Sequence, residues 1–162
     1  MKQIFNFTTD KEKIKNLIND IRYDRYNRVI VYTNGCFDVL HPGHVYLLNE
    51  SAKLGDILIV GVNSDKSVKL LKGEGRPILN EEDRSYMLSS LNAVDYVIIF
   101  DEINTVHLIE FLEPDIITKA SEYKIKDLDE VGGKFMKENG KKVILIPYKQ
   151  GLSTSNLIKK LN

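Results

Sequence analysis

Apolar and β-branched residues gather in five short runs along the chain, and segments with a helical spacing of apolar residues separate them. The runs cover residues 28–32, 56–62, 96–100, 115–118 and 142–146. A near-continuous apolar run is typical of a strand buried on both faces of a parallel sheet. Strands that alternate with helices form parallel sheets with right-handed crossovers. The pattern therefore predicts an α/β fold, with a five-stranded parallel sheet and helices on both faces.

A further amphipathic segment precedes the first apolar run. Its apolar positions, at helical spacing behind possible N-cap residues 8–10, are Ile14, Leu17, Ile18 and Ile21. We expect residues 1–27 to form a helical lead-in. The chain has 162 residues, enough for one hydrophobic core, so residues 1–162 are predicted to be a single domain.

The most informative stretch is the turn at residues 33–44, which joins the first predicted strand to a helix. In an open α/β sheet such a turn lies at the carboxyl ends of the strands, where ligands bind. Pro42 suits the first turn of a helix, and Gly43 would let a ligand approach the backbone. Free N–H groups at a helix start bind phosphate, so the turn predicts a site for a phosphate chain.

His41 and His44 carry the candidate chemistry of this turn. Residues three apart lie on one side of a helix, so both imidazoles can donate to phosphate oxygens as negative charge develops. A plain pair of capping or surface histidines is one alternative. A metal pair is another, but no adjacent Cys, His or acidic cluster completes a zinc site.

Two signatures in order along the chain resemble the HxGH nucleotidyltransferase family, in its cytidylyltransferase-like branch. The first is Asn34-Gly35-Cys36-Phe37-Asp38 with the histidine pair, and the second is residues 151–155, Gly-Leu-Ser-Thr-Ser. Residues 62–65, 71–73, 76–77 and 82–84 are similar to adenylyltransferases that act on D-glycero-β-D-manno-heptose 1-phosphate, either stand-alone or as the C-terminal domain of a bifunctional kinase/adenylyltransferase. The resemblance covers nearly the whole chain. It implies a Rossmann-like sheet of order 3-2-1-4-5 and a homodimer.

The resemblance implies nucleotidyl transfer, in which a sugar phosphate oxygen attacks the α-phosphorus of a nucleoside triphosphate and pyrophosphate leaves. Catalysis is then mainly alignment and charge neutralisation. The implied catalytic residues are His41, His44, Lys72 and Thr154. The nucleotide site adds Thr33, Asn34, Gly35, Cys36, Phe37, Lys119, Glu122, Tyr123, Ser153 and Ser155 to the two histidines and Thr154. The sugar phosphate is assigned to Asp38, Lys72, Arg76 and Arg84. Mg²⁺ is expected to accompany the triphosphate, without a dedicated protein site.

Each of these residues also has an ordinary structural interpretation. Residues 153–155 could simply cap a helix, the basic residues could be solvated, and Asp38 could cap the turn. His107 matches no motif and is expected to be structural or exposed.

The chain departs from the family at residues 119–123, Lys-Ala-Ser-Glu-Tyr, where heptose phosphate enzymes usually have Lys-Gly-Gly-Asp-Tyr. Each added Cβ restricts the backbone and narrows a groove expected to face the nucleotide. Glycerol 3-phosphate cytidylyltransferases tend to carry an arginine shortly before the second signature, where this chain has Tyr148-Lys149. That difference favours ATP, although CTP with a polyol or sugar phosphate remains the alternative.

Composition limits the remaining function classes. Lys plus Arg and Asp plus Glu both number 23, so net charge gives no argument for a nucleic acid partner. The sequence has neither an apolar run that could span a membrane nor a signal peptide, and Cys36 is the only cysteine. A cytoplasmic protein is predicted. A non-catalytic nucleotide-binding subunit is the alternative of another class, and it would require a broken site.

Overall fold

The computed structural model describes residues 3–23, 27–121 and 132–147, which form a parallel sheet flanked by helices. The strands are β1 (Gln3–Asn6), β2 (Ile30–Gly35), β3 (Ile57–Asn63), β4 (Tyr96–Phe100), β5 (Ile116–Ala120) and β6 (Lys142–Ile146). The helices are α1 (Lys11–Tyr23), α2 (Pro42–Ala52), α3 (Asp65–Lys72), α4 (Glu81–Ser89), α5 (Val106–Leu112) and α6 (Gly133–Glu138). Among the described residues, no helix is long and apolar enough to cross a membrane.

The sheet has the order β1-β4-β3-β2-β5-β6, and all pairs of neighbouring strands are parallel. The five predicted strands are present in the predicted order, with β2 in the middle of those five. The predicted strand count is wrong by one, because β1 adds a sixth strand beside β4. The lead-in is therefore a strand followed by a helix. This strand has only four residues, of which Phe5 alone is buried, so it shows no apolar run.

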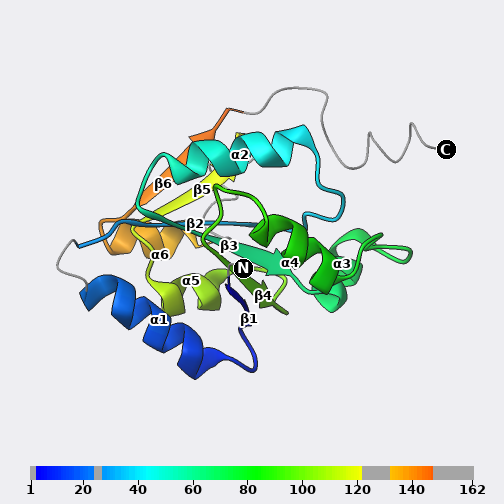
Figure 1. Cartoon of the computed structure of the whole chain (residues 1–162), viewed down its shortest axis with the longest axis horizontal. Helices are drawn as coiled ribbons and strands as arrows, with labels where there is room; N and C mark the ends of the chain where they lie inside the picture. Colours follow the sequence, from blue (N-terminus) through cyan, green and yellow to red (C-terminus); the bar gives the residue numbers. More distant parts are fainter. Residues whose placement is uncertain (1–2, 24–26, 122–131, 148–162) are drawn as a thin grey trace.

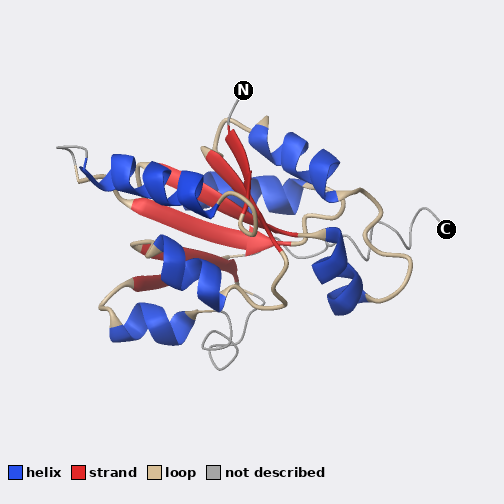
Figure 2. Ribbon diagram, turned by 90° about the horizontal axis from the view of Figure 1, so that it is seen from below, coloured by secondary structure: helices blue, strands red, loops and turns tan. Residues whose placement is uncertain are grey.

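Helices cover both faces of the sheet, as predicted (Figures 1 and 2). One core cluster joins the sheet to α1, α5 and α6, and includes Ile14, Leu108 and Met136. The second cluster joins the other face to α2 and α4 through Leu48 and Leu88. Burial of the isoleucine-rich face of α1 explains the helical spacing that predicted it.

The central strands β2 and β3 end at the same edge of the sheet, where α2 and α3 begin (Figure 1). Gly61 of β3 lies beneath the Tyr32 side chain of β2. A Cβ at Gly61 would lie 2.2 Å from the Tyr32 hydroxyl, so no larger residue fits beneath that ring. The Tyr32 side chain thus packs on the backbone of β3 two residues before that strand ends.

Candidate active site

The turn at residues 33–44, called the histidine turn below, leaves β2 through a strained residue. Phe37 has a φ of 47°, in the left-handed region that costs an ordinary residue roughly 1–2 kcal/mol. Its ring is buried and packs edge-on against His44, with the ring centroids 5.0 Å apart. A Cβ at Gly35 would lie 3.3 Å from the same ring. Packing around Phe37 thus holds the turn in a conformation that the backbone alone would not favour.

His41 is the N-cap of α2. Its Nδ1 accepts hydrogen bonds from the backbone N–H of Gly43 at 3.1 Å and of His44 at 3.3 Å. An imidazole nitrogen that accepts carries no proton, so the proton of the neutral ring lies on Nε2. His41 therefore satisfies the helix start with one nitrogen and keeps the other as a donor for a ligand.

The two imidazole rings stack, with centroids 3.7 Å apart and an angle of 20° between their planes. Burial lowers the pKa of His41. The pKa of His44 falls to about 3, mainly through burial and then through repulsion by His41, against an opposing effect of the Val39 carbonyl. Among the described residues, no partner makes a hydrogen bond of normal geometry with the buried Nδ1 of His44. Burial thus disfavours the charged form of both rings, and a neutral imidazole still has one N–H that can donate to a ligand.

Lys119 lies at the end of β5 beside the histidine turn. Its side chain is buried, and its ammonium donates to the Asn34 side-chain oxygen. Burial lowers the pKa of Lys119 to about 7. A cation or amine is thus held against Asn34, one of the residues predicted to bind the nucleotide. Thr33 contributes differently, because its hydroxyl donates to the Thr118 carbonyl at 3.0 Å and ties β2 to β5.

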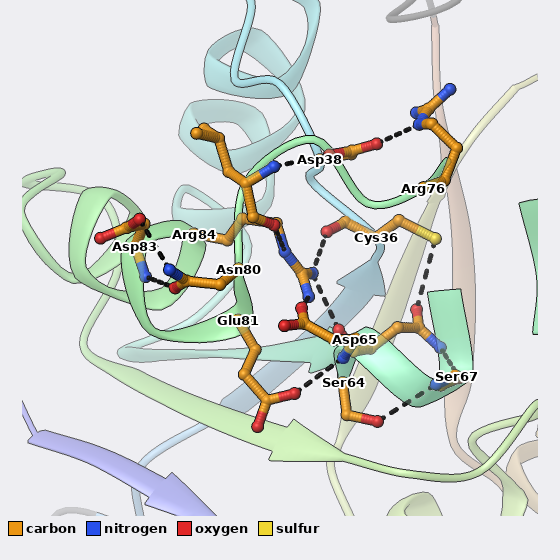
Figure 3. Close-up of polar contacts among 12 residues, drawn as sticks. Cys36, Asp38, Ser64, Asp65, Ser67, Arg76, Asn80, Glu81, Asp83 and Arg84 are labelled. Atoms are coloured by element: carbon orange, nitrogen blue, oxygen red, sulfur yellow. Dashed lines mark hydrogen bonds and ion pairs between the residues drawn. The ribbon is translucent and has the colours of Figure 1, made fainter. Parts of the chain in front are cut away.

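Asp38 is buried, and both of its carboxylate oxygens have protein donors. One oxygen pairs with the Arg76 guanidinium, and the other accepts from the backbone N–H of Ile78 at 2.6 Å and of Leu79 at 3.3 Å. Figure 3 shows Asp38 reaching from the turn to Arg76. The carboxylate therefore holds the segment of residues 72–79, called the basic segment below, against the histidine turn.

Lys72 and Arg76 lie close enough to Cys36 to affect its thiol. Burial raises the pKa of Cys36, while Lys72, Arg84 and Arg76 oppose that rise electrostatically. Lys72 is exposed at the end of α3. The structure thus brings the basic segment and the histidine turn together, with positive charge near the Cys36 thiol.

Arg84 differs from these two cations, because its side chain is fully buried. All three of its guanidinium nitrogens donate within the protein, to the carbonyls of Cys36, Asn63 and Leu79 and to the Asp65 carboxylate. The predicted phosphate contact would have to compete with these bonds. From the sequence, residues 62–65 are expected only to resemble adenylyltransferases, and no site role is predicted for Asn63 or Asp65. Ser64 does cap α3, and its side chain accepts from Ser67 N–H at 3.2 Å.

Several predicted site residues lie outside the described part of the chain. These are Glu122, Tyr123, Ser153, Thr154 and Ser155. Within the described ranges, no group of three or more His, Cys, Asp or Glu side chains could hold a metal ion. His107 lies on α5, away from the histidine turn in sequence and on a helix that packs on the opposite core cluster.

Most of this chain is similar in sequence to a known family and to curated proteins. A family model described as cytidylyltransferase-like matches residues 32–160. The bifunctional protein HldE of Helicobacter acinonychis (strain Sheeba) is 44% identical over 148 residues, which are 91% of this chain and 30% of that protein. The HldE of Campylobacter fetus subsp. fetus (strain 82-40) is 46% identical over 151 residues, which are 93% of this chain and 32% of that protein. The chain spans about a third of the length of these curated relatives.

Solved structures agree on the architecture. A lipopolysaccharide core biosynthesis protein from Thermoplasma volcanium GSS1 superposes with a TM-score of 0.62 and 30% identity, over 75% of this chain and 97% of that one. A pantoate-beta-alanine ligase from Francisella tularensis has a TM-score of 0.68 but only 14% identity, over 100% of this chain and 74% of that one. The second likeness concerns the fold alone.

Proposed function

Because the chain belongs to the cytidylyltransferase-like family, we propose that it is an adenylyltransferase that transfers AMP from ATP to a sugar 1-phosphate. The proposed acceptor is D-glycero-β-D-manno-heptose 1-phosphate, and the products are pyrophosphate and an ADP-sugar for lipopolysaccharide or another surface glycan. The acceptor's phosphate oxygen forms a bond to the α-phosphorus as the bond to the pyrophosphate oxygen breaks.

The observation that carries this proposal is the stacked histidine pair at the start of α2. Charge builds on the phosphate oxygens during transfer, and donors that are already oriented stabilise it at little reorganisation cost. His41 has its Nε2–H available, because its other nitrogen is fixed by the helix start. The positive end of the helix dipole at this start favours an anionic ligand. The N–H groups of Gly43 and His44, expected from the sequence to be free for phosphate, instead donate to His41 Nδ1.

The remaining residues have proposed roles in binding. The turn residues Thr33 to Phe37 and Lys119 would position the nucleotide, with Glu122, Tyr123 and the 153–155 signature completing its site. Lys72 and Arg76 would neutralise phosphate charge, and Thr154 would contact the phosphates that leave. Asp38 would set the position of Arg76, given the ion pair between them.

Mg²⁺ is proposed to arrive with the triphosphate. Mg²⁺ commonly keeps several waters and binds substrate phosphates through few protein carboxylates. The carboxylate of Asp38 in the histidine turn already accepts from Arg76, Ile78 and Leu79. The residues present therefore fit a metal that is held mainly by the nucleotide. A cytoplasmic homodimer is also proposed, and light scattering after size-exclusion chromatography tests its stoichiometry.

The decisive assay is pyrophosphate release with each nucleoside triphosphate, with and without D-glycero-β-D-manno-heptose 1-phosphate. Release that needs both ATP and this sugar supports the proposal. Release with CTP and glycerol 3-phosphate or another polyol phosphate would replace it by a cytidylyltransferase. The double variant His41→Ala with His44→Ala tests the non-catalytic alternative, because a cellular role that survives both changes needs no catalysis.

A further inference from the structure

Arg84 connects three backbone segments near the predicted site (Figure 3). They are the turn after β2, the end of β3 and the loop between α3 and α4. Its Nη1 donates to the Cys36 carbonyl at 2.5 Å and to the Asn63 carbonyl at 2.8 Å. Its Nε donates to the Leu79 carbonyl at 3.0 Å, and its Nη2 pairs with the Asp65 carboxylate at 2.7 Å. These four acceptors and the guanidinium together are called the arginine junction below.

Three of the four acceptors are backbone carbonyls, and the fourth is the Asp65 carboxylate. Cys36 follows the last residue of β2, Asn63 is the last residue of β3, and Leu79 ends the basic segment. A buried carbonyl without a partner costs roughly 1–3 kcal/mol, so three of them at one place need a buried donor. A planar guanidinium supplies several donors in a fixed fork, which the single ammonium of a lysine cannot reproduce.

A second set of contacts joins the histidine turn to the basic segment. Asp38, two residues after Cys36, accepts from Arg76 and from the N–H groups of Ile78 and Leu79. Leu79 is thus held at its N–H by Asp38 and at its carbonyl by Arg84. The histidine turn and the basic segment are joined at two adjacent points and should move as one unit.

We propose that Arg84 is a positioning residue that sets the spacing between the histidine turn and the basic segment, in place of a direct phosphate contact. The proposal rests on the proposed function, in which the first element holds the nucleotide and the second neutralises phosphate charge through Lys72 and Arg76. Transfer requires the attacking oxygen and the α-phosphorus to be aligned closely. A misplacement of about 1 Å between such elements can cost about 10²-fold in rate.

The first test compares Arg84→Lys with the matched control Asp65→Asn. The lysine keeps a positive charge but cannot reach all three carbonyls, whereas the asparagine keeps an oxygen acceptor and loses only the charge of a partly exposed partner. At saturating concentrations of both substrates, Arg84→Lys should lower kcat by about 10- to 100-fold per folded molecule. Asp65→Asn should stay within about twofold of wild type, because an exposed ion-pair partner contributes little.

Folded protein is quantified by circular dichroism, and each assay runs well below that variant's unfolding midpoint. A purely structural role would lower the midpoint and leave kcat per folded molecule unchanged, and this result would overturn the proposal. Addition of ethylguanidinium to Arg84→Ala gives a second readout. Recovery of kcat with the alkylguanidinium, but not with an alkylammonium of equal concentration, is expected if the fork geometry matters.

Asp38→Asn serves if the Arg84 variants do not fold, because it loosens the second tie between the same segments. A wild-type kcat in Asp38→Asn would then overturn the proposal. A reduced kcat with an unchanged KM for the sugar phosphate would support it, because loss of the proposed binding role of Asp38 would raise that KM. If the wild-type protein releases no pyrophosphate with any acceptor, the proposed function fails on its own. The dissociation constant for ATP, measured by calorimetry, then replaces kcat as the readout, and an unchanged value in Arg84→Lys would overturn the positioning role.

Discussion

The histidine turn and the arginine junction meet at Cys36, yet they use polar groups in opposite ways. The junction has a fully buried cation, all of whose nitrogens donate to protein acceptors. The histidine turn has two stacked imidazole rings that retain hydrogen-bonding capacity after the helix start has been capped. Polar groups whose hydrogen bonds are all made within the protein stabilise the fold. Oriented groups with an unused donor or acceptor can instead bind a ligand. The number of hydrogen-bonding groups left unused therefore distinguishes a structural residue from a candidate ligand-binding residue. The residue type alone does not make that distinction.

The largest expected effect separates the two functions of His41. Asparagine is a good N-cap, so His41→Asn should keep the start of α2 while it removes the Nε2 donor. We expect kcat to fall by about 10²- to 10³-fold, the usual cost of losing one donor to a developing charge. The unfolding midpoint should change by only a few degrees. Steady-state pyrophosphate release and a thermal melt check both expectations. A variant that loses activity only in proportion to unfolded protein would assign His41 to the helix alone.

Arg84→Ala, unlike His41→Asn, should lower the stability of the fold strongly. It leaves three carbonyls without their donor, and the free energy of unfolding should fall by about 3 kcal/mol. Urea denaturation followed by circular dichroism measures this loss. A loss below about 1 kcal/mol would mean that water replaces the guanidinium, and the contrast with His41 would disappear.

Acid should lower the free energy of unfolding through protonation of His44. Its folded pKa of about 3 lies below the ordinary value of 6.5, so the unfolded chain binds the proton more readily between these values. The stabilisation is complete above about pH 6.5 and declines as pH falls toward 3. At pH 5 the expected loss is about 2 kcal/mol relative to neutral pH. Denaturation of wild type and His44→Gln at pH 7 and pH 5 tests the assignment, since the variant should lose less. Equal losses in the two proteins would place the acid sensitivity elsewhere.

The smallest expected effect is that of the Asp65 charge. Its carboxylate pairs with Arg84 but is 41% exposed, so solvent screens the ion pair. Asp65→Asn should reduce the free energy of unfolding by less than about 1 kcal/mol. Comparison with Arg84→Ala in the same denaturation series then separates two contributions to the stability of the junction. One comes from the Asp65 charge and the other from the backbone hydrogen bonds. A loss as large as that of Arg84→Ala would show that the charge dominates.

Much of the fold follows from local sequence, because buried parallel strands need continuous apolar runs. Strand β1 escapes this logic, since four residues with one buried side chain have no periodic pattern. The spacing of His41 and His44 likewise predicts that they face one side of the helix. Their stacking and the proton position on His41 depend on contacts that spacing does not encode. Arg84 stands at the start of a helix in a charged stretch, where exposure is usual, and its burial depends on acceptors up to 48 residues away.

The double use of His41 also limits how this protein can change over generations. A residue that only caps the helix can be exchanged for Ser, Asp or Asn with little harm to folding. The same exchange at position 41 removes the Nε2 donor and leaves a sound fold behind. Descendants released from selection for the proposed chemistry should therefore accumulate other good N-caps here and keep their shape. Such copies would persist as stable, inactive proteins, and the residue at position 41 would mark them.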